Sequence, residues 1–418
     1  MKKESLVILN YQREIPPFII NIIKIARDKF DKIYYVTPRL YRDNFSEIKQ
    51  SNVKLVQGRR GEKVWNLIIL PFLLLDLRIL REISQAINWH RISKAFINSF
   101  LQTVVASNYL KKKTEVIIEN NDNENFYILS AYLGAEAYAA AKLKERFTSI
   151  RTMALAHSFE VNPERDKNVD LHMNTFFHEF LDNINFISKS VYEKYSDYVL
   201  KKYSISTKNI TFIHLGCEKL VDKVSPPSED GIFRIVSCST VNPNKQLHRL
   251  LKVIASWKTI PLIWTHIGEG PDFVGLSREA ELIMRKNPNV LIRLLGYKSN
   301  AYVHSFYVEN SVDLFINISL IEGLPVSLME CMAYGIPAIA TDVGGNKEIV
   351  NSETGFLIPQ SFSDELLLDI LEKYWAISPD VKQVYRDNSF NQWKTNFKGG
   401  KNINDLFSIL LNKRQSAT

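Results

Sequence analysis

Short apolar runs rich in β-branched residues alternate with helical stretches along the chain, and this alternation begins twice. It first starts near Leu6, with SLVILN, FIINIIKIARDKF and KIYYVT, and it starts again at Phe233 with FRIVSCS. Strands that are apolar almost throughout suit a parallel sheet covered on both faces by crossover helices. The sequence therefore predicts an α/β fold made of two Rossmann-like domains.

A turn-rich, charged stretch, VDKVSPPSEDG, separates the two alternations and is typical of a linker. We place an N-terminal domain at 1–220, the linker at 221–231 and a C-terminal domain at 232–377. Residues 378–418 show helical patterns without a strand, and we expect these helices to pack back on the N-terminal domain. A chain of 418 residues with 45% apolar residues is long enough to bury two cores.

Cysteine usage and the apolar runs predict where the protein works. Cys217, Cys238 and Cys331 lie far apart and lack the paired spacing of zinc or redox sites, so we expect reduced thiols in the cytoplasm. The apolar run at Leu6–Leu9 is too short for a signal peptide. The most apolar stretch, 67–75, falls short of the roughly 20 residues that span a bilayer. We therefore predict a cytoplasmic protein without a transmembrane helix.

The positive charge of the chain belongs to its first part. Residues 1–113 hold 21 Lys plus Arg against 9 Asp plus Glu, whereas the rest holds 32 against 36. A basic face suits nucleic acid, an anionic membrane or a phosphorylated acceptor. Arg59, Arg60 and Lys63 lead into VWNLIILPFLLLDL, so cations adjoin an apolar helical face, as in interfacial helices. A buried helix with solvated flanks is an equal alternative. We expect an anionic membrane surface as the partner, and no nucleic acid.

The stretch EGLPVSLMECMAYGIPAIATDVGG follows the expected strand VDLFINIS, so a loop and the start of a helix meet there. Ligands of doubly wound sheets bind outside the carboxyl ends of the strands, where a helix N-terminus offers free N–H groups to an anion. Gly323, Leu324 and Val326 are therefore predicted to hold a phosphate. Glu322 and Glu330 flank this anion site and suit sugar hydroxyls, although glutamates are also common near helix starts for electrostatic reasons alone. The combination indicates a nucleotide sugar.

The same stretch resembles the E-x(7)-E signature of the family 4 retaining glycosyltransferases, which have the GT-B fold. The resemblance implies two domains facing across a cleft, with Glu322 on the donor hexose and Glu330 on the ribose. The segments THIGEGP, with Gly268, and LGYKSN, with Tyr297, are similar to donor-side segments of that family. We therefore expect Gly268 to contact the donor and Tyr297 its base. The resemblance also implies no metal and no cofactor.

The family places an arginine and a lysine after the first strand of its second domain, and both neutralise the donor diphosphate. In the segment VSCSTVNPNKQLHR, Lys245 matches the lysine, but Thr240 stands at the position of the arginine. Arg249 is expected one helical turn beyond Lys245 on the same face, where it supplies the missing charge. A solvated helix cation is the alternative for Arg249.

In the first half of the chain, TMALAHSFEV places His157 where the family's H-x-x-D segment has a donor-binding histidine. Glu160 stands in place of the aspartate, and Leu155 stands where we expect an arginine in close relatives. A lone histidine is ordinarily structural, but its place at a strand end about halfway along the chain favours a role in the site.

We thus predict a retaining glycosyltransferase with Glu322, Lys245 and His157 as its catalytic residues. It moves a hexose-type sugar from a nucleotide-diphosphate sugar, with UDP favoured over GDP, to a glycan or lipid-linked acceptor of a bacterial cell-surface polysaccharide. Departure and attack on the same face are expected, because no carboxylate nucleophile is evident. The alternatives are a sugar-nucleotide 2-epimerase and a non-catalytic GT-B partner or glycan-binding subunit. A peripheral position at the inner face of the cell membrane is expected.

Overall fold

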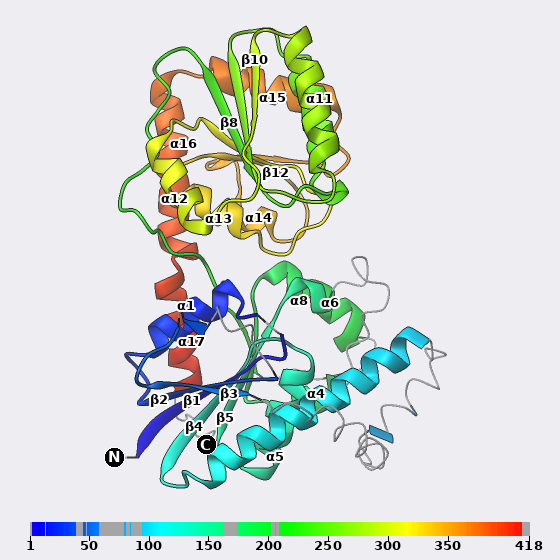
Figure 1. The fold of residues 1–418 in the computed structure, drawn as a ribbon, viewed down its shortest axis with the longest axis vertical. Helices are drawn as coiled ribbons and strands as arrows, with labels where there is room; N and C mark the ends of the chain where they lie inside the picture. Colours follow the sequence, from blue (N-terminus) through cyan, green and yellow to red (C-terminus); the bar gives the residue numbers. More distant parts are fainter. Residues whose placement is uncertain are drawn as a thin grey trace. The chain divides into compact units, whose positions relative to one another are not determined.

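The computed structural model describes residues 2–12, 14–38, 45–46, 48–57, 79–80, 84, 94–161, 174–201, 205 and 209–411. The chain forms two compact units, shown in Figure 1. Unit 1 comprises Met1–Leu215 and Gly400–Thr418, and unit 2 comprises Gly216–Gly399. The membrane-binding helix predicted from Arg59, Arg60 and Lys63 and the apolar run 67–75 lies outside the described residues.

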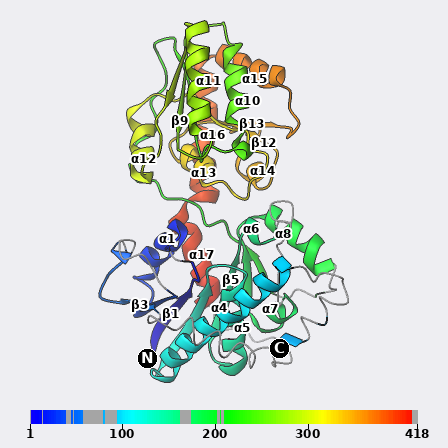
Figure 2. The same cartoon turned by 45° about the vertical axis from the view of Figure 1, so that its right-hand side comes forward.

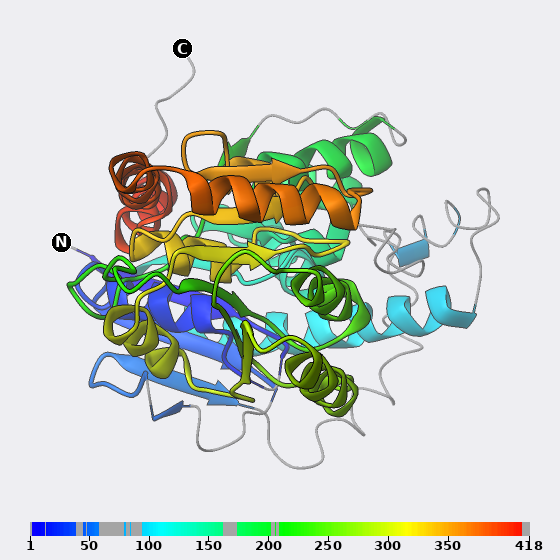
Figure 3. The same ribbon diagram turned by 90° about the horizontal axis from the view of Figure 1, so that it is seen from above.

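Unit 1 is built on a seven-stranded parallel sheet in the order β3-β2-β1-β4-β5-β6-β7. Most positions of β1, β2, β4 and β5 are buried, which explains why these strands are apolar almost throughout. Helix α4, cyan in Figures 1 and 3, has 26 residues and packs along α5. The elements are β1 (Lys3–Leu9), α1 (Pro17–Ala26), β2 (Lys32–Thr37), β3 (Val53–Gln57), α4 (Lys94–Glu119), β4 (Glu124–Ser130), α5 (Ala135–Arg146), β5 (Arg151–Ala156), α6 (Ser158–Val161), α7 (Asn174–Phe180), β6 (Asn183–Phe186), α8 (Lys189–Tyr195), the π-helix η2 (Ser196–Leu200), β7 (Ile210–Phe212) and α17 (Gly399–Leu411).

Unit 2 is built on a six-stranded parallel sheet in the order β10-β9-β8-β11-β12-β13. Its elements are β8 (Phe233–Cys238), the 3-10 helix η3 (Pro243–Lys245), α10 (Leu247–Ala255), β9 (Leu262–Ile267), α11 (Phe273–Lys286), β10 (Val290–Leu294), α12 (Asn300–Glu309), β11 (Leu314–Asn317), α13 (Val326–Ala333), β12 (Ala338–Thr341), α14 (Asn346–Ile349), β13 (Gly355–Ile358), α15 (Asp364–Ala376), α16 (Pro379–Gln392) and the π-helix η4 (Trp393–Phe397).

Two apolar clusters cover the two faces of the unit 2 sheet. One cluster joins the strands to α10, α11 and α15, and the other joins them to α12, α13 and η4. Figure 2 shows α10 and α11 together. Helix α10 illustrates the pattern, because its buried Leu247, Leu250, Leu251 and Ile254 fall on one helical face. A sheet covered on both faces leaves the loops at its ends as the places open to a ligand.

The C-terminal helices divide between the two units, although we expected all of 378–418 to pack on the N-terminal domain. Helix α16 belongs to unit 2, where Arg386 donates to the carbonyl oxygen of Val312 over 2.9 Å. Helix α17 belongs almost entirely to unit 1, where the rings of Phe407 and Phe30 lie 5.3 Å apart. The division therefore falls near Gly399.

The stretch expected to be a linker, 221–231, packs against unit 2. The backbone N–H of Ser225 donates to the carbonyl oxygen of Tyr334 over 2.9 Å, and the hydroxyl of Ser228 donates to Asp313 over 2.9 Å. The polar residues of this stretch therefore form hydrogen bonds with unit 2, and the stretch is part of that unit.

The predicted fold class, two parallel-sheet α/β units with a helical C-terminal part, is confirmed. None of the helices in the described part of the chain combines the length and the apolarity needed to cross a membrane.

Candidate functional site

The switch point of the unit 2 sheet lies between β8 and β11, which are neighbours although three α-helices, one 3-10 helix and two strands separate them in sequence. In doubly wound sheets the crevice at the carboxyl ends of such a strand pair is where ligands bind. Two loops leave the sheet there, 239–246 after β8 and 318–325 after β11. These loops carry Lys245 and Glu322.

Asn244 holds the two loops together. Its side-chain amide donates to the carbonyl oxygen of Ile321 over 3.0 Å and its Oδ1 accepts from the N–H of the same residue over 2.9 Å. The N–H of Leu320 donates to the carbonyl oxygen of Asn244 over 2.8 Å. Gln246 adds a bond from its side-chain amide to the carbonyl oxygen of Ile318 over 2.7 Å. The switch-point loops are thus fixed to each other by paired backbone and side-chain bonds.

Lys245 and Glu322 form an ion pair within this frame. The ammonium nitrogen of Lys245 lies 2.5 Å from Oε1 of Glu322, and the side-chain amide of Asn317 donates to the same oxygen over 3.3 Å. The side chain of Lys245 is 21% exposed and that of Glu322 is 10% exposed, so both remain reachable. Oε2 of Glu322 makes no hydrogen bond within the described part of the chain. The switch point therefore carries an ammonium group paired with one oxygen of a carboxylate, and the second oxygen of that carboxylate can still accept a hydrogen bond.

The glycine pair Gly344–Gly345 sets the position of the Glu322 loop. A Cβ at Gly344, where φ is +54°, would lie 2.0 Å from the carbonyl oxygen of Glu322. The N–H of Gly345 donates to the carbonyl oxygen of Gly323 over 2.6 Å. Only a residue without a side chain permits this approach and this backbone angle.

Gly268 and Gly270 serve a similar purpose on the other side of the site. A Cβ at Gly268, where φ is +144°, would lie 1.9 Å from the carbonyl oxygen of Ser239, and one at Gly270 would lie 2.9 Å from Cγ2 of Thr240. The loop after β9 therefore packs directly on the loop after β8. Thr240 itself is exposed at the surface of that loop. The structure gives Gly268 a packing role, and its predicted donor contact stays a prediction.

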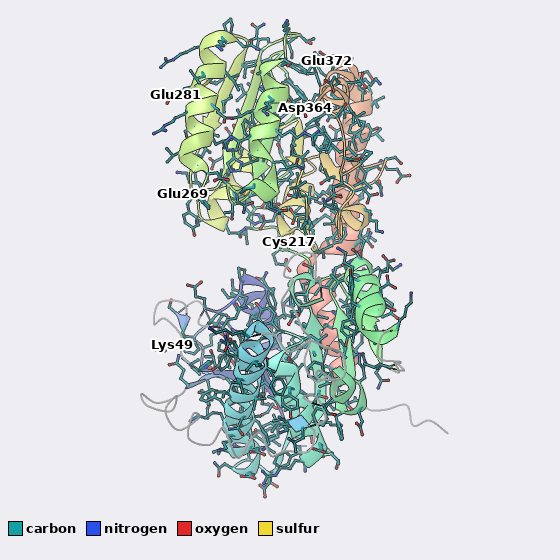
Figure 4. The ribbon with its side chains drawn as sticks, turned by 90° about the vertical axis from the view of Figure 1, so that its right-hand side faces the viewer. Lys49, Cys217, Glu269, Glu281, Asp364 and Glu372 are labelled. Atoms are coloured by element: carbon teal, nitrogen blue, oxygen red, sulfur yellow. The ribbon has the colours of Figure 1, made fainter. Side chains whose placement is uncertain are left out.

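Arg249 lies apart from Lys245. Gln246 has a left-handed backbone, with φ of 50°, which separates η3 from α10. The expectation that Lys245 and Arg249 share one face of one helix is therefore wrong. Arg249 donates from its Nε to Asp364 over 2.6 Å and stacks over the ring of Phe362 at 3.8 Å. Figure 4 labels Asp364. The guanidinium charge of Arg249 is thus already paired with α15.

The start of α13 carries the predicted phosphate-binding backbone. Pro325 precedes the helix and gives it no side-chain cap, so no side chain of the N-cap residue occupies its first N–H groups. Val326 is half exposed, Leu324 is partly buried, and Gly323 is fixed through its carbonyl oxygen. These groups border the Glu322 loop directly.

Glu330 lies in α13 and is 8% exposed. Its Oε1 accepts from the side-chain amide of Asn300 over 2.6 Å, and Nε2 of His304 lies 3.7 Å away. Tyr297, in the turn after β10, is 76% exposed, and Gly296 before it has φ of +68° with open space where a Cβ would stand. Tyr297 therefore lies at the carboxyl end of β10, whereas Glu330 lies within the helix that follows β11.

His157 belongs to unit 1 and follows β5. Its Nε2 donates to the carbonyl oxygen of Ala131 over 3.1 Å, since a carbonyl accepts only, and its ring packs against Phe18 and Tyr132. Burial lowers the pKa of His157 to about 4, so the imidazole is neutral near pH 7. A role in binding would rest on hydrogen bonding and not on charge.

Glu160 and Leu155 explain how this segment differs from the expected pattern. The N–H of His157 donates to the carboxyl group of Glu160 over 2.9 Å, and burial raises the pKa of Glu160 well above its ordinary value. Leu155 is fully buried in β5, so the position where we expected an arginine is a core position.

The structure therefore brings Lys245 and Glu322 together, whereas the side chain of Arg249 is engaged by Asp364 and Phe362. Asn244, Asn317 and Asn300 support the predicted residues and were not anticipated from the sequence. Asn244 carried a signal, because it directly precedes Lys245 in the loop after a buried strand. No comparable signal marked the other two.

A family model described as Glycosyl transferases group 1 matches residues 219–388. The chain is 32% identical over 140 residues to the GtfA subunit of a UDP-N-acetylglucosamine–peptide N-acetylglucosaminyltransferase of Streptococcus agalactiae, covering 32% of this chain and 26% of that protein. It is 25% identical over 166 residues to the putative teichuronic acid biosynthesis glycosyltransferase TuaC of Bacillus subtilis, covering 39% and 38%. The matches thus span about a quarter to two fifths of these curated relatives.

Solved structures share the fold over nearly the whole chain. Anabaena HepE in complex with UDP has a TM-score of 0.68 at 13% identity, covering 97% of this chain and 99% of that one. The lipopolysaccharide outer core galactosyltransferase WaaB has a TM-score of 0.65 at 15% identity, covering 97% and 99%. The chain therefore has the two-unit fold of these GT-B structures, and its residues 219–388 match the Glycosyl transferases group 1 model.

Proposed function

We propose that the chain is a retaining glycosyltransferase of family 4 that takes a hexose-type sugar from a nucleotide-diphosphate sugar, with UDP favoured over GDP. The contact between Lys245 and Glu322 at the switch point carries the proposal. In such a donor the hexose is bonded directly to the outer phosphate, so a cation for the phosphate and a carboxylate for the sugar hydroxyls must lie side by side. The Glu322–Glu330 spacing and the UDP complex of HepE support the same assignment.

Each residue of the site has a defined role in this proposal. Without donor, Lys245 and Glu322 neutralise each other; with donor, Lys245 turns to the diphosphate and Glu322 accepts from a hexose hydroxyl. Backbone N–H groups at Gly323, Leu324 and Val326 add donors to the phosphate. These groups stabilise the charge on the departing phosphate as the glycosidic bond breaks, and such a preorganised donor is worth about 3 kcal/mol in the transition state.

The remaining assignments follow the resemblance to family 4. Glu330 accepts from the ribose, Tyr297 contacts the base, and His157 is assigned to the donor sugar as a neutral imidazole. Departure of the phosphate and attack of the acceptor take place on the same face of the hexose, without a metal. Thr240 leaves the diphosphate one cation short of the family pattern, unless Arg249 exchanges Asp364 for the donor.

The acceptor we propose is a glycan or lipid-linked intermediate of a cell-surface polysaccharide, bound through unit 1. Support comes from TuaC and from the putative colanic acid biosynthesis glycosyltransferase WcaL of Salmonella typhimurium, 27% identical over 147 residues covering 34% of this chain and 36% of WcaL. The excess of cations in residues 1–113 suits the anionic inner face of a cell membrane. We therefore place the protein in the cytoplasm, peripheral to that membrane.

A donor panel tests the proposal. The protein is incubated with UDP- and GDP-sugars, with and without an acceptor lipid extract and with and without EDTA, and nucleotide release is measured. We expect release from one donor class, unaffected by EDTA, lost in Lys245→Ala and kept in the exposed control Lys286→Ala. Binding without release would favour a non-catalytic partner, to which the Thr240 position also points. An epimerised nucleotide sugar would favour a 2-epimerase.

A further inference from the structure

Two pairs of polar side chains face each other between α12 and α13. Asn300 and His304 lie four residues apart on α12. Glu330 lies on α13, and Tyr334, four residues later, is the C-cap of that helix. Each pair therefore occupies one helical face. Figures 1 and 2 show the two helices side by side. Glu330, His304 and Tyr334 are buried, whereas Asn300 is exposed. Buried polar groups need partners, and Glu330 finds one in Asn300 while His304 and Tyr334 pair with each other.

Hydrogen bonding fixes the tautomer of His304. The N–H of Val221 donates to the hydroxyl oxygen of Tyr334 over 3.3 Å, and Nδ1 of His304 lies 2.7 Å from that oxygen. Burial raises the pKa of Tyr334, so its hydroxyl keeps its proton and donates it to Nδ1. The ring proton of His304 therefore sits on Nε2, which faces Oε1 of Glu330 at 3.7 Å.

Two polar groups of α12 lie near the same oxygen of Glu330. Asn300 donates to Oε1 over 2.6 Å, and Nε2 of His304 lies 3.7 Å from Oε1, beyond hydrogen-bonding distance. Oε2 accepts no hydrogen bond within the described ranges, and it is not among the buried atoms without a partner. Oε1 is therefore held by Asn300, while Oε2 keeps some exposure to solvent.

We propose that Asn300 and His304 are positioning residues that orient Glu330 so that Oε2 accepts from the 2′ and 3′ hydroxyls of the donor ribose. The inference rests on the proposed function of the same site. Asn300 is exposed at the first turn of α12, beside the turn that carries Tyr297, so the held carboxylate borders the predicted base-binding segment. Because Asn300 and His304 orient Glu330, the site then prefers ribonucleotides to deoxyribonucleotides.

The experiment compares the affinities of UDP and 2′,3′-dideoxy-UDP, and of the matching GDP pair, by isothermal titration calorimetry. For the wild-type protein we expect the ribonucleotide to bind roughly ten- to a hundred-fold more tightly, as for a hydrogen bond to a charged group. In Asn300→Leu and His304→Phe this preference falls several-fold, while the affinity for the dideoxy compound stays within about two-fold. Glu330→Gln sets the lower limit of the preference. Glu309→Gln, an exposed change at the far end of α12, is the control.

The outcomes are distinct. An unchanged ratio of the affinities for the ribonucleotide and the dideoxy compound in both variants overturns the inference. An equal loss of affinity for both compounds also overturns it, because that is the result expected if these residues only hold the two helices together. Asn300 is exposed, so its variant is readable even where His304→Phe fails to fold. A wild-type protein that binds no nucleotide at all refutes the proposed function itself. Binding of nucleotide with a lost ratio in both variants supports the two proposals together.

Discussion

Glu136 of unit 1 makes the stability of the protein depend on pH. It lies in the first turn of α5, where its Oε1 accepts from the N–H of Tyr11 over 2.8 Å. Burial raises its pKa from 4.5 to about 7. Within the described ranges, the ionisable groups that face it are Glu160, Tyr35 and Tyr132, which are all acids and bring no compensating positive charge.

The direction and size of the effect follow from the two pKa values. The folded protein binds the Glu136 proton more tightly than the unfolded chain, so stability falls as the pH rises from about 4.5 to about 7. The difference between the two pKa values corresponds to at most about 3 kcal/mol in the free energy of unfolding. About 2 to 3 kcal/mol of this stabilisation is lost between pH 5 and pH 8. The variant Glu136→Gln keeps an acceptor for Tyr11 and cannot ionise. It should therefore lack this loss.

Hydrogen-exchange mass spectrometry on peptides covering β4 and α5 measures the effect in unit 1. Variant and wild type are compared at the same pH, so the intrinsic exchange rates cancel. We expect similar protection at pH 5 and an opening free energy higher by about 2 to 3 kcal/mol in the variant at pH 8. Glu179→Gln, exposed on α7, is the control. Equal pH dependence in Glu136→Gln and wild type would refute the reasoning.

Three further changes probe the site in unit 2. Gly344→Ala puts a Cβ 2.0 Å from a carbonyl oxygen, so nucleotide release should fall at least ten-fold with unchanged circular dichroism; Gly231→Ala, also at positive φ but in open space, should leave release unchanged. Lys245→Ala should weaken donor binding more than Arg249→Ala, because Arg249 is engaged by α15; equal losses in calorimetry would contradict this. Thr240→Arg should tighten UDP binding roughly ten-fold through a new phosphate contact, and unchanged affinity would argue against a diphosphate beside Thr240.

The sequence was sufficient to predict both sheets, and the family resemblance assigned Lys245 and Glu322 to one donor site. Apolar runs of strand length are visible because parallel strands are buried on both faces. Lys245 and Glu322 each follow such a run, and a doubly wound order makes those two strands neighbours. Residues that follow neighbouring strands at the same edge of a sheet lie close in space, even when many residues separate them in the sequence.

Other features depend on contacts that the sequence does not encode in a readable pattern. Gln246 adopts a left-handed backbone, which a pattern based on residue types assigns to glycine or asparagine, so the helix break before Arg249 was missed. Ser225 and Ser228 bond to unit 2, yet a packed coil and a free linker share the same Pro, Ser and Asp composition. The pairing of Asn300 with Glu330 joins two helices and has no local signal.

The central claim is that the Lys245–Glu322 pair holds a nucleotide sugar for glycosyl transfer. The most direct measurement incubates the protein with a labelled nucleotide sugar and an acceptor lipid extract, then detects the glycosylated product by mass spectrometry and its anomeric configuration by NMR. We predict a product with retained configuration from wild type and Lys286→Ala, and none from Lys245→Ala or Glu322→Gln. A product of unchanged yield from both Lys245→Ala and Glu322→Gln, or an inverted anomer from the wild-type protein, would contradict the account.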